Sequence, residues 1–594
     1  MRLEEYWGVG PKTSATLVEQ LGRERARQAI ETGDVRTLSD AGLARGRATR
    51  ILRRATGGSG MDVLATSDAR AAYKQLLEVV VEHAVTERAA DQIRVLTPLS
   101  SREAMAERLD DVLAAREAWA ALEDDDRDTV LAAYDRYDDR DGSEHAAVET
   151  ALALLEAGVD SGPFEAVATL EQERLTDAAR ALAALDDGRV SAGADDELDR
   201  LRATLGAIED IDANAAELLE ELRSDGVRDV GQFREAVEDH LLAETSVTVD
   251  RVREAMASDA ADATDFIRTT LRTLRADLTA AIDERETTVA SDLEETLEAA
   301  RPAVDRAVTA VDDIALSLSL ARFALAYDCT RPAYVEGDAD AAAISVVGAR
   351  NLTLATDGAD ESVQPVTYAL GEHGVHTVPE GVNAVPGTER VSVLTGANSG
   401  GKTTLLETLC QIVLLAMMGI PVPAERAEVT PVDALVFHRR HASFNAGVLE
   451  STLRSIVPPL SAEGRTLMLV DEFEAITEPG SAAELLHGLV RLAVDQDALG
   501  VFVTHLADDL APLPAEARVD GIFAEGLNPD LELQVDYQPR FDTVGRSTPE
   551  FIVSRLVANA TDRRERAGFE TLAEAVGNEA VQRTLADVRW RERD

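Results

Sequence analysis

The chain has 594 residues and a formal net charge of −51, and 45% of its residues are hydrophobic. This apolar content excludes a disordered chain and is enough for three or four folded domains. No run of about 18 apolar residues occurs, and the start is not a secretory signal, so we expect a cytoplasmic protein with no membrane partner.

The negative charge is spread along the whole chain, and only three of the 59 basic residues are lysines: Lys12, Lys74 and Lys402. A highly charged surface stays hydrated when salt screens its charges, so this composition indicates a halophilic protein in a high-salt cytoplasm. The two cysteines, Cys329 and Cys410, have no His or Cys partner nearby in the sequence. We therefore predict neither a zinc site nor a disulfide.

Residues 1–57 differ from the rest in charge. Eleven basic residues stand against seven acidic ones, a net charge of +4, so the remainder of the chain carries −55. A basic module in so acidic a protein favours a polyanionic partner.

The same module contains an internal repeat. Gly8–Leu17 aligns with Gly42–Ile51 at an offset of 34 residues, and each segment is a tight turn that opens an amphipathic helix. The repeat resembles the tandem helix-hairpin-helix DNA-binding fold, in which hairpin N–H groups hold a phosphate. The resemblance implies DNA contacts, and we name as candidates Gly8, Gly10, Lys12, Gly42, Arg45 and Arg47. A small helical protein-interaction module is the alternative.

Gly57-Gly58-Ser59-Gly60 is a flexible linker, and residues 61–330 are rich in helix-forming residues. Two stretches repeat apolar residues at alternating spacings of three and four, which places them on one stripe of a helix. The stripes are Leu198, Leu201, Leu205, Ile208, Ala215, Leu219 and Leu222, then Ile267, Leu271, Leu274, Leu278 and Ala281. With a break near 225–231, we predict a helical lever with antiparallel coiled-coil arms at about 165–290. An ordinary helical core is the alternative.

Residues 335–594 alternate short apolar runs with helical stretches, which predicts an α/β domain ending in a helical segment. The run Val391–Thr395 leads into Gly396-Ala397-Asn398-Ser399-Gly400-Gly401-Lys402-Thr403-Thr404, which fits G-x-x-x-x-G-K-[ST]. Glycines there let backbone N–H groups surround phosphate oxygens at a helix start. We expect these nine residues to bind ATP, with Lys402 on the phosphates and Thr403 on Mg²⁺.

Two further apolar runs end in candidate catalytic residues. The run Thr466–Val470 ends in Asp471 and Glu472, which we expect to hold Mg²⁺ and to act as general base, respectively. The run Gly500–Val503 delivers His505 to the same edge, where it could hydrogen-bond the γ-phosphate or the attacking water. A purely structural histidine is the alternative.

The order of these parts carries a family resemblance. Lys402 and Asp471 are 69 residues apart, too few for the coiled coil that SMC-type ATPases insert there, and the helical arms lie upstream. This order resembles the MutS family of DNA mismatch-recognition ATPases. The segments similar to that family's motifs are Tyr327–Pro332, Gly396–Thr404, Met418–Asp433, Asp471–Gly480 and Thr504-His505.

The sequence also departs from the family pattern. Asn445–Thr452 is a degraded form of the signature that acts across the dimer, and Ile476 replaces a glycine. We find neither the F-x-E wedge of mismatch readers nor room for a C-terminal Smr domain. The likeness is therefore to the archaeal DNA-binding branch of MutS homologues with a helix-hairpin-helix head.

The resemblance implies a multidomain protein: an all-α helix-hairpin-helix head (1–57), an all-α lever and coiled-coil clamp (61–330), and an α/β P-loop ATPase of MutS type (335–594). It implies a homodimeric, Mg²⁺-dependent, DNA-binding ATPase clamp, nucleoid-associated and acting in DNA repair or recombination. We expect it to be structure-selective or non-specific rather than mismatch-specific. The alternatives are an ABC-type chromosome-maintenance ATPase and a DNA-architectural protein with a vestigial ATPase.

Overall fold

The computed structural model describes residues 3–56, 60–140, 142–186, 188–224, 230–256, 260–335, 342–357, 363–375, 385–396, 401–440, 446–473, 479–527, 531, 533–545, 549–577 and 581–584. The chain forms two compact units. Unit 1 contains residues 1–131, 161–163 and 312–594, and unit 2 contains residues 132–160 and 164–311.

Unit 1 begins with a small helical module: α1 (Pro11–Leu21), α2 (Arg23–Glu31), α3 (Val35–Asp40) and α4 (Arg45–Thr56). Leu17, Ile30 and Leu38 are fully buried in its apolar cluster. Gly8 and Gly42 have φ angles of 78° and 92°, a left-handed conformation that glycine adopts without strain. They lie at equivalent points of the 34-residue repeat, just before α1 and α4.

The next helices of unit 1 are α5 (Ser67–Val81), α6 (Glu87–Val95), α7 (Arg102–Ala121) and the start of α8 (Asp124–Asp139). Thr66, Thr86 and Ser101 cap the first three, each side-chain oxygen accepting a hydrogen bond from the N–H three residues later. These helices pack against the C-terminal part of α16 (Ala263–Ala326), whose Phe323 is fully buried.

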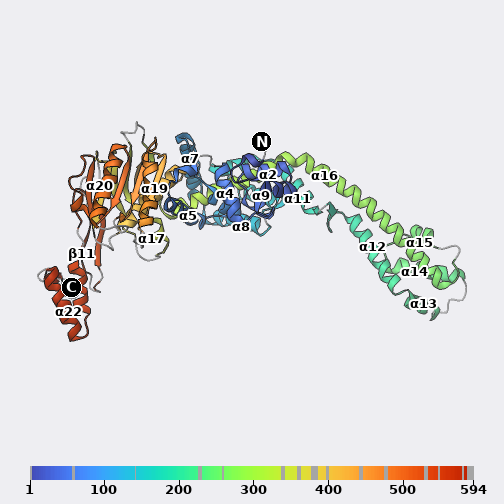
Figure 1. The fold of residues 1–594 in the computed structure, drawn as a ribbon. Coiled ribbons are helices and arrows are strands. Elements are labelled where there is room, and N and C mark those ends of the chain that lie inside the picture. The colour runs from blue at the N-terminus through green and yellow to red at the C-terminus, as the bar shows by residue number, and fades with distance from the viewer. Residues whose placement is uncertain are drawn as a thin grey trace. The chain divides into compact units, whose positions relative to one another are not determined.

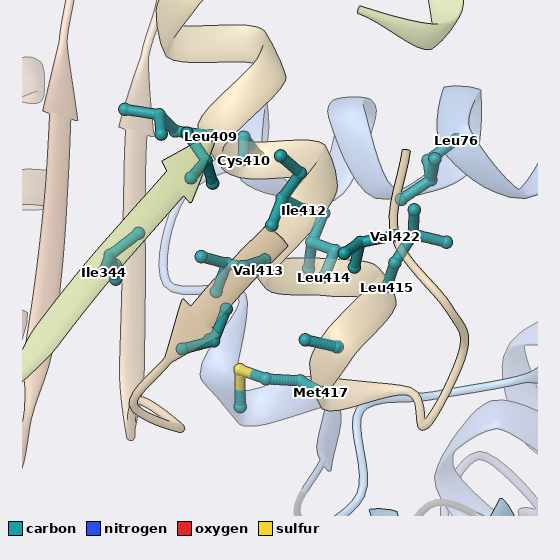
Figure 2. Close-up of a cluster of buried hydrophobic side chains, with 14 of the residues drawn as sticks. Leu76, Ile344, Leu409, Cys410, Ile412, Val413, Leu414, Leu415, Met417 and Val422 are labelled. Atoms are coloured by element: carbon teal, nitrogen blue, oxygen red, sulfur yellow. The ribbon is translucent and has the colours of Figure 1, made fainter. Parts of the chain in front are cut away.

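The largest apolar cluster of unit 1 is built around α18 (Lys402–Met417), which is buried along most of its length (Figure 2). In that cluster Leu76 of α5, Ile344 of β4 (Ala343–Ala349) and Leu409 of α18 are all buried. A helix that is apolar on all sides has to be enclosed by other elements. The helix following the glycine-rich turn is therefore held firmly in place.

The larger sheet contains β6 (Val391–Gly396), β8 (Ala434–His438), β9 (Thr466–Val470), β10 (Leu499–Val503), β11 (Ala517–Leu527) and β12 (Leu533–Arg540). Within the described residues its strand order is β12-β11-β6-β10-β9-β8. All neighbours pair in parallel except β11 with β12. Strands β6, β9 and β10 are buried at every position, which explains their continuous apolar runs.

A smaller sheet has the order β3-β7-β4-β5, with β3 (Ala333–Tyr334), β5 (Val366–Gly371) and β7 (Arg426–Val429) joining β4. The remaining helices of unit 1 are α17 (Leu352–Asp357), α19 (Ala446–Leu460), α20 (Pro479–Asp495), α21 (Pro549–Asn559) and α22 (Arg563–Val576). Figure 1 shows α19 and α20 beside the strands of the larger sheet. The predicted α/β character of the C-terminal region is confirmed.

Unit 2 is helical apart from a short hairpin, β1 (Leu185–Asp186) with β2 (Arg189–Val190). Its helices in the described residues are the remainder of α8, α9 (Glu144–Glu156), α10 (Glu165–Ala168), α11 (Gln172–Ala184), α12 (Asp196–Ala213), α13 (Ala215–Ser224), α14 (Val230–Glu244), α15 (Val249–Ala255) and most of α16 (Figure 1).

The two predicted stripes meet in unit 2, where Ile208 of α12 shares an apolar cluster with Leu271 and Leu274 of α16. Asp195, the N-cap of α12, accepts hydrogen bonds from the Arg285 guanidinium at 2.6 and 3.0 Å, and these bonds lower the pKa of Asp195 to about 2. In the predicted break, residues 225–229 lie outside the described part of the chain. The helix of the second stripe continues past Ala281 to Ala326.

Candidate active site

Three strands of the larger sheet bring the predicted chemical groups to one edge. Strand β10 lies between β6 and β9, and all three run in the same direction. The carboxyl ends of parallel strands meet at one edge of a sheet, and that edge is where α/β proteins bind ligands. Gly396, the pair Asp471-Glu472 and His505 are therefore neighbours in space.

The glycine-rich turn is described only at its two ends, because Ala397, Asn398, Ser399 and Gly400 lie outside the described residues. Gly396 has a φ of 134°, and a Cβ there would approach the Ile522 carbonyl oxygen to 2.2 Å. Gly401 has a φ of 72°, and a Cβ there would lie 2.7 Å from Cδ1 of Tyr537. Gly396 has no room for a side chain because the Ile522 backbone lies too close, and both glycines have positive φ angles that other residues rarely adopt.

Lys402, the first residue of α18, is buried, and its Nζ donates a hydrogen bond of 2.8 Å to the Gly396 carbonyl oxygen. This contact connects the residue that follows the glycine-rich turn to the residue that begins it. Thr404 follows within the first turn of the helix, and its carbonyl oxygen accepts a hydrogen bond from Asn351 Nδ2 at 3.3 Å. The N-terminal end of a helix attracts anions through its dipole and its unpaired N–H groups, so the local geometry suits a phosphate.

The predicted metal ligands lie in contact with each other. Thr403 Oγ1 donates a hydrogen bond of 2.7 Å to Asp471 Oδ2, and the Asp471 carboxylate is buried. A hydroxyl and a carboxylate oxygen are hard ligands of the kind that Mg²⁺ prefers, usually together with phosphate oxygens and water. The donor set therefore fits Mg²⁺, although among the described residues no group of three or more His, Cys, Asp or Glu side chains forms a site for a metal ion.

Glu472, the predicted general base, is engaged at both carboxylate oxygens. His505 Nε2 lies 3.0 Å from Oε1, and Arg440 Nη1 lies 2.7 Å from Oε2. Glu472 also has a φ of 39°, in the left-handed region that residues other than glycine rarely adopt. Backbone strain of this kind is typical of functional sites.

The sequence alone did not identify the residues at the carboxyl end of strand β8 as part of the site. Arg439 and Arg440 directly follow β8, and Arg439 Nη2 forms an ion pair of 2.9 Å with Glu407 of α18. Burial raises the pKa of Glu407, and the nearby Asp471 raises it further while Arg439 opposes both effects. Two consecutive arginines at the carboxyl end of an apolar run were the available signal, because that end lies at the same edge as Asp471.

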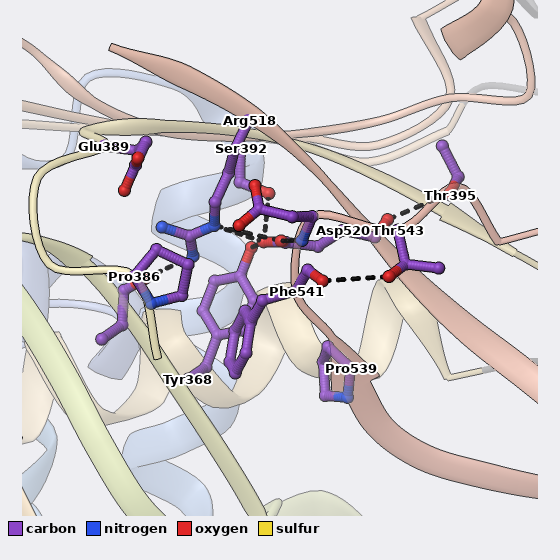
Figure 3. A network of polar contacts seen from close by, with 12 residues as sticks. Tyr368, Pro386, Glu389, Ser392, Thr395, Arg518, Asp520, Pro539, Phe541 and Thr543 are labelled. Atoms are coloured by element: carbon purple, nitrogen blue, oxygen red, sulfur yellow. Dashed lines mark hydrogen bonds and ion pairs between the residues drawn. The ribbon is translucent and has the colours of Figure 1, made fainter. Parts of the chain in front are cut away.

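A buried network of hydrogen bonds connects β6 to β5 and β11 (Figure 3). Asp520 of β11 accepts hydrogen bonds from Ser392 of β6 at 2.6 Å, from Tyr368 of β5 at 2.8 Å and from Arg518 Nε at 3.0 Å. Burial raises the pKa of Tyr368 well above its usual value, and the Asp520 charge adds to the effect. Arg518 keeps a raised pKa even though burial lowers it, since Asp520 and Tyr368 outweigh burial.

The candidate DNA-binding residues lie on the amino-terminal module. Gly8, Gly10, Lys12 and Gly42 are exposed around the two turns. Arg47 Nη2 donates a hydrogen bond of 2.6 Å to Thr13 Oγ1, which ties the second repeat to the first. The Arg45 guanidinium forms an ion pair with Asp91 of α6, so a carboxylate of the same chain competes with any phosphate there.

Other predicted features have simple outcomes. Cys329 and Cys410 are buried free thiols. Asn445 and Ile476 lie outside the described residues, and Ala446–Thr452 forms the first turns of α19. Within the part of the chain that the structure describes, none of the helices combines the length and apolarity needed to cross a bilayer.

Comparison with known proteins supports the family resemblance. Residues 392–516 match the family model of MutS domain V. The chain is 45% identical over 216 residues to a DNA-binding protein MutS2 of Pyrococcus furiosus, which covers 36% of each chain. It is 26% identical over 494 residues to a DNA mismatch repair protein MutS of Natronomonas pharaonis, covering 76% of this chain and 53% of that protein. The predicted resemblance to the MutS family is thereby confirmed.

A third relative, an endonuclease MutS2 of Thermus thermophilus, is 30% identical over 188 residues, which is 30% of this chain and 25% of the relative. In these three comparisons the chain spans between a quarter and about half of the relatives' lengths. The matched region of domain V includes β6 except its first residue, together with Asp471, Glu472 and His505.

Proposed function

This chain carries a domain of the MutS family, and from that premise we propose that it is a Mg²⁺-dependent ATPase that binds DNA. The observation that carries the proposal is the contact of Thr403 with Asp471, next to Glu472 and His505 at the end of parallel strands. A vestigial site has no need to keep two contacts of this kind, Thr403 with Asp471 and Glu472 with His505, at one edge of the sheet.

In the proposed reaction, each residue has one task. Lys402 and the helix N-terminus hold the phosphates, and Thr403 and Asp471 hold Mg²⁺, which neutralises charge on the phosphate oxygens. Glu472 accepts the proton of the attacking water. His505 orients the Glu472 carboxylate through the 3.0 Å contact with Oε1.

The proposed DNA-binding surface is the basic module with its repeated turns. Lys12 and the turn glycines Gly8, Gly10 and Gly42 are exposed, so a phosphate can approach both turns. The Pyrococcus relative is named a DNA-binding protein, which supports the same substrate class. Contacts of this kind do not read bases, so we propose structure-selective or non-specific binding in a high-salt, nucleoid-associated setting.

We further propose that two copies form an ATP-dependent clamp. In unit 2, α12 and α16 share an apolar cluster, and we propose that they form the paired arms of the clamp. Sedimentation in multimolar KCl with ATP and Mg²⁺ tests this idea, and we expect a dimer. A chain that stays monomeric under these conditions would remove the clamp from the proposal.

The ATPase itself is tested by replacing Glu472. Glu472→Gln keeps the shape and loses the basicity, so turnover should fall by roughly 10²–10⁴-fold while ATP still binds. Lys402→Ala should weaken ATP binding instead, and Lys74→Ala, on the distant face of α5, is the matched lysine control. Turnover that is unchanged in Glu472→Gln would move the general base elsewhere. A wild-type chain with no turnover, with or without DNA, would favour the DNA-architectural alternative.

A further inference from the structure

The strongest unexplained contact of the site is the ion pair between Arg440 and Glu472. Arg440 Nη1 lies 2.7 Å from Glu472 Oε2, and the Glu472 side chain is only 11% exposed, whereas that of Arg440 is 57% exposed. His505 occupies the other oxygen, Oε1. Each carboxylate oxygen of Glu472 therefore already has one nitrogen partner in this arrangement.

A general base needs a free lone pair within hydrogen-bond reach of the water that it deprotonates. His505 on Oε1 orients the carboxylate, as proposed above. Arg440 on Oε2 restrains the same carboxylate, and its release would free one acceptor position for the attacking water.

The position of Arg440 is set by a segment far away in the sequence. Leu64 pairs with Leu435 in a parallel bridge beside β8, and the Ala65 N–H donates a hydrogen bond of 3.1 Å to the Leu435 carbonyl oxygen. Leu64 therefore forms an isolated bridge with β8 at the edge of the larger sheet.

The same segment also forms hydrogen bonds with the end of β8 and the residue that follows it. Thr66 Oγ1 donates a hydrogen bond of 2.6 Å to the Phe437 carbonyl oxygen, and Asp68 Oδ2 accepts one of 2.9 Å from the Arg439 N–H. These contacts fix the backbone immediately before Arg440.

We propose that Arg440 is a positioning residue that holds Glu472 in a resting arrangement, and that the segment Leu64–Asp68 keeps Arg440 in place. This inference rests on the proposed ATPase function and adds a control of the general base to it. This control connects residues 64–68, which follow the amino-terminal module, to the carboxylate of Glu472. The basal rate of hydrolysis is then limited by release of the ion pair.

The test measures steady-state phosphate release and ATP affinity in the full-length chain. Arg440→Ala should raise kcat by about twofold to fivefold, the range expected for a half-exposed ion pair, with KM and ATP affinity unchanged. Arg440→Lys keeps the cation and should restore most of the repression. Arg454→Ala, which removes an exposed arginine of α19 paired with Glu450, is the matched control.

The second arm of the test changes the segment that positions Arg440. Asp68→Ala should raise kcat in the same direction but less, with Glu103→Ala, an exposed acid in the first turn of α7, as its control. The double variant Asp68→Ala/Arg440→Ala should equal Arg440→Ala alone, because both changes release the same contact.

A fall in kcat in Arg440→Ala, or a kcat equal to that of the wild type, would overturn the inference while leaving the proposed ATPase intact. Full additivity of the two changes would separate Asp68 from Arg440 and overturn the role given to Leu64–Asp68. A wild-type chain that neither binds nor hydrolyses ATP would instead overturn the proposed function itself. The two failures are thus distinguishable.

Discussion

Thr403 Oγ1 donates a hydrogen bond of 2.7 Å to Asp471 Oδ2 and so joins the first turn of α18 to the end of β9 across 68 residues of sequence. The contact places a hydroxyl and a carboxylate oxygen side by side where α18 begins. It thereby links the helix that follows the glycine-rich turn to the strand that precedes Glu472.

Thr403→Val, which keeps the side-chain shape and removes the hydroxyl, should raise the Mg²⁺ concentration needed for half-maximal turnover. We expect an increase of about tenfold to a hundredfold, the usual cost of disturbing the immediate environment of a bound metal. Turnover measured over a Mg²⁺ titration checks this. Thr403→Ser retains the hydroxyl and should behave like the wild type, and an equal shift in both variants would contradict the role of Oγ1.

Asp520→Ala should strongly destabilise the region around the larger sheet. It leaves the Arg518 guanidinium, whose side chain is 1% exposed, without its carboxylate, and breaking a buried ion pair from one side costs about 3–5 kcal/mol. Tyr368→Phe removes one hydrogen bond to the same carboxylate and should cost less, about 1.5–3 kcal/mol. Denaturant unfolding followed by a probe in this region compares the two. Equal losses would mean that the Arg518 charge is satisfied in another way.

The two cysteines should be unreactive in the folded chain. Burial raises the pKa of the Cys329 and Cys410 thiols to about 12, so at pH 8 very little of the reactive thiolate is present. A thiol reagent should modify two groups only after unfolding in denaturant. A thiol that reacts rapidly in the native chain would contradict the buried positions.

The same shift predicts the direction of a pH effect on stability. The folded pKa of each thiol lies above the unfolded value of about 8.5, so the folded chain keeps protons that the unfolded chain releases. Stability contributed by the protonated thiols is complete below about pH 8.5 and declines as the pH rises toward 12. Replacing both cysteines by Ala should flatten this decline in unfolding experiments.

Lys12→Ala should weaken DNA binding equally for all sequences. Loss of one phosphate contact should lower the log–log salt slope by about 0.9, whereas Lys74→Ala should leave the slope unchanged. Arg45→Ala should have a smaller effect than Lys12→Ala, because Arg45 is already paired with Asp91. Affinities measured over a KCl series check these changes.

The DNA contacts proposed here also predict little discrimination between matched and mismatched duplex. Phosphate contacts carry no base information, and intercalating side chains of the kind that detect unstacked bases are not part of this proposal. Competition between matched and mismatched duplexes measures the ratio. A preference above about tenfold, or roughly 1.4 kcal/mol, would contradict non-specific binding.

Local sequence by itself predicted the parts of the site that neighbouring residues determine. The glycines around Lys402 and the apolar runs ending at Val470 and Val503 follow from local rules, because a buried parallel strand needs a continuous apolar run. The helices opening at Pro11 and Arg45 follow from the repeated turns in the same way. The continuation of α16 past the predicted stripe to Ala326 was not predicted from local sequence, because helix-forming residues continue through the stripe and beyond it.

Only the tertiary structure decided which groups touch. The insertion of β10 between β6 and β9 brings His505 to Glu472, and strand order is a choice among pairings that the apolar pattern alone leaves equal. Asp68 meets the Arg439 backbone across 371 residues, and Tyr368 meets Asp520 across 152. Contacts at such separations depend on how whole elements pack, because side-chain periodicity reports which face of an element is buried but not which partner buries it.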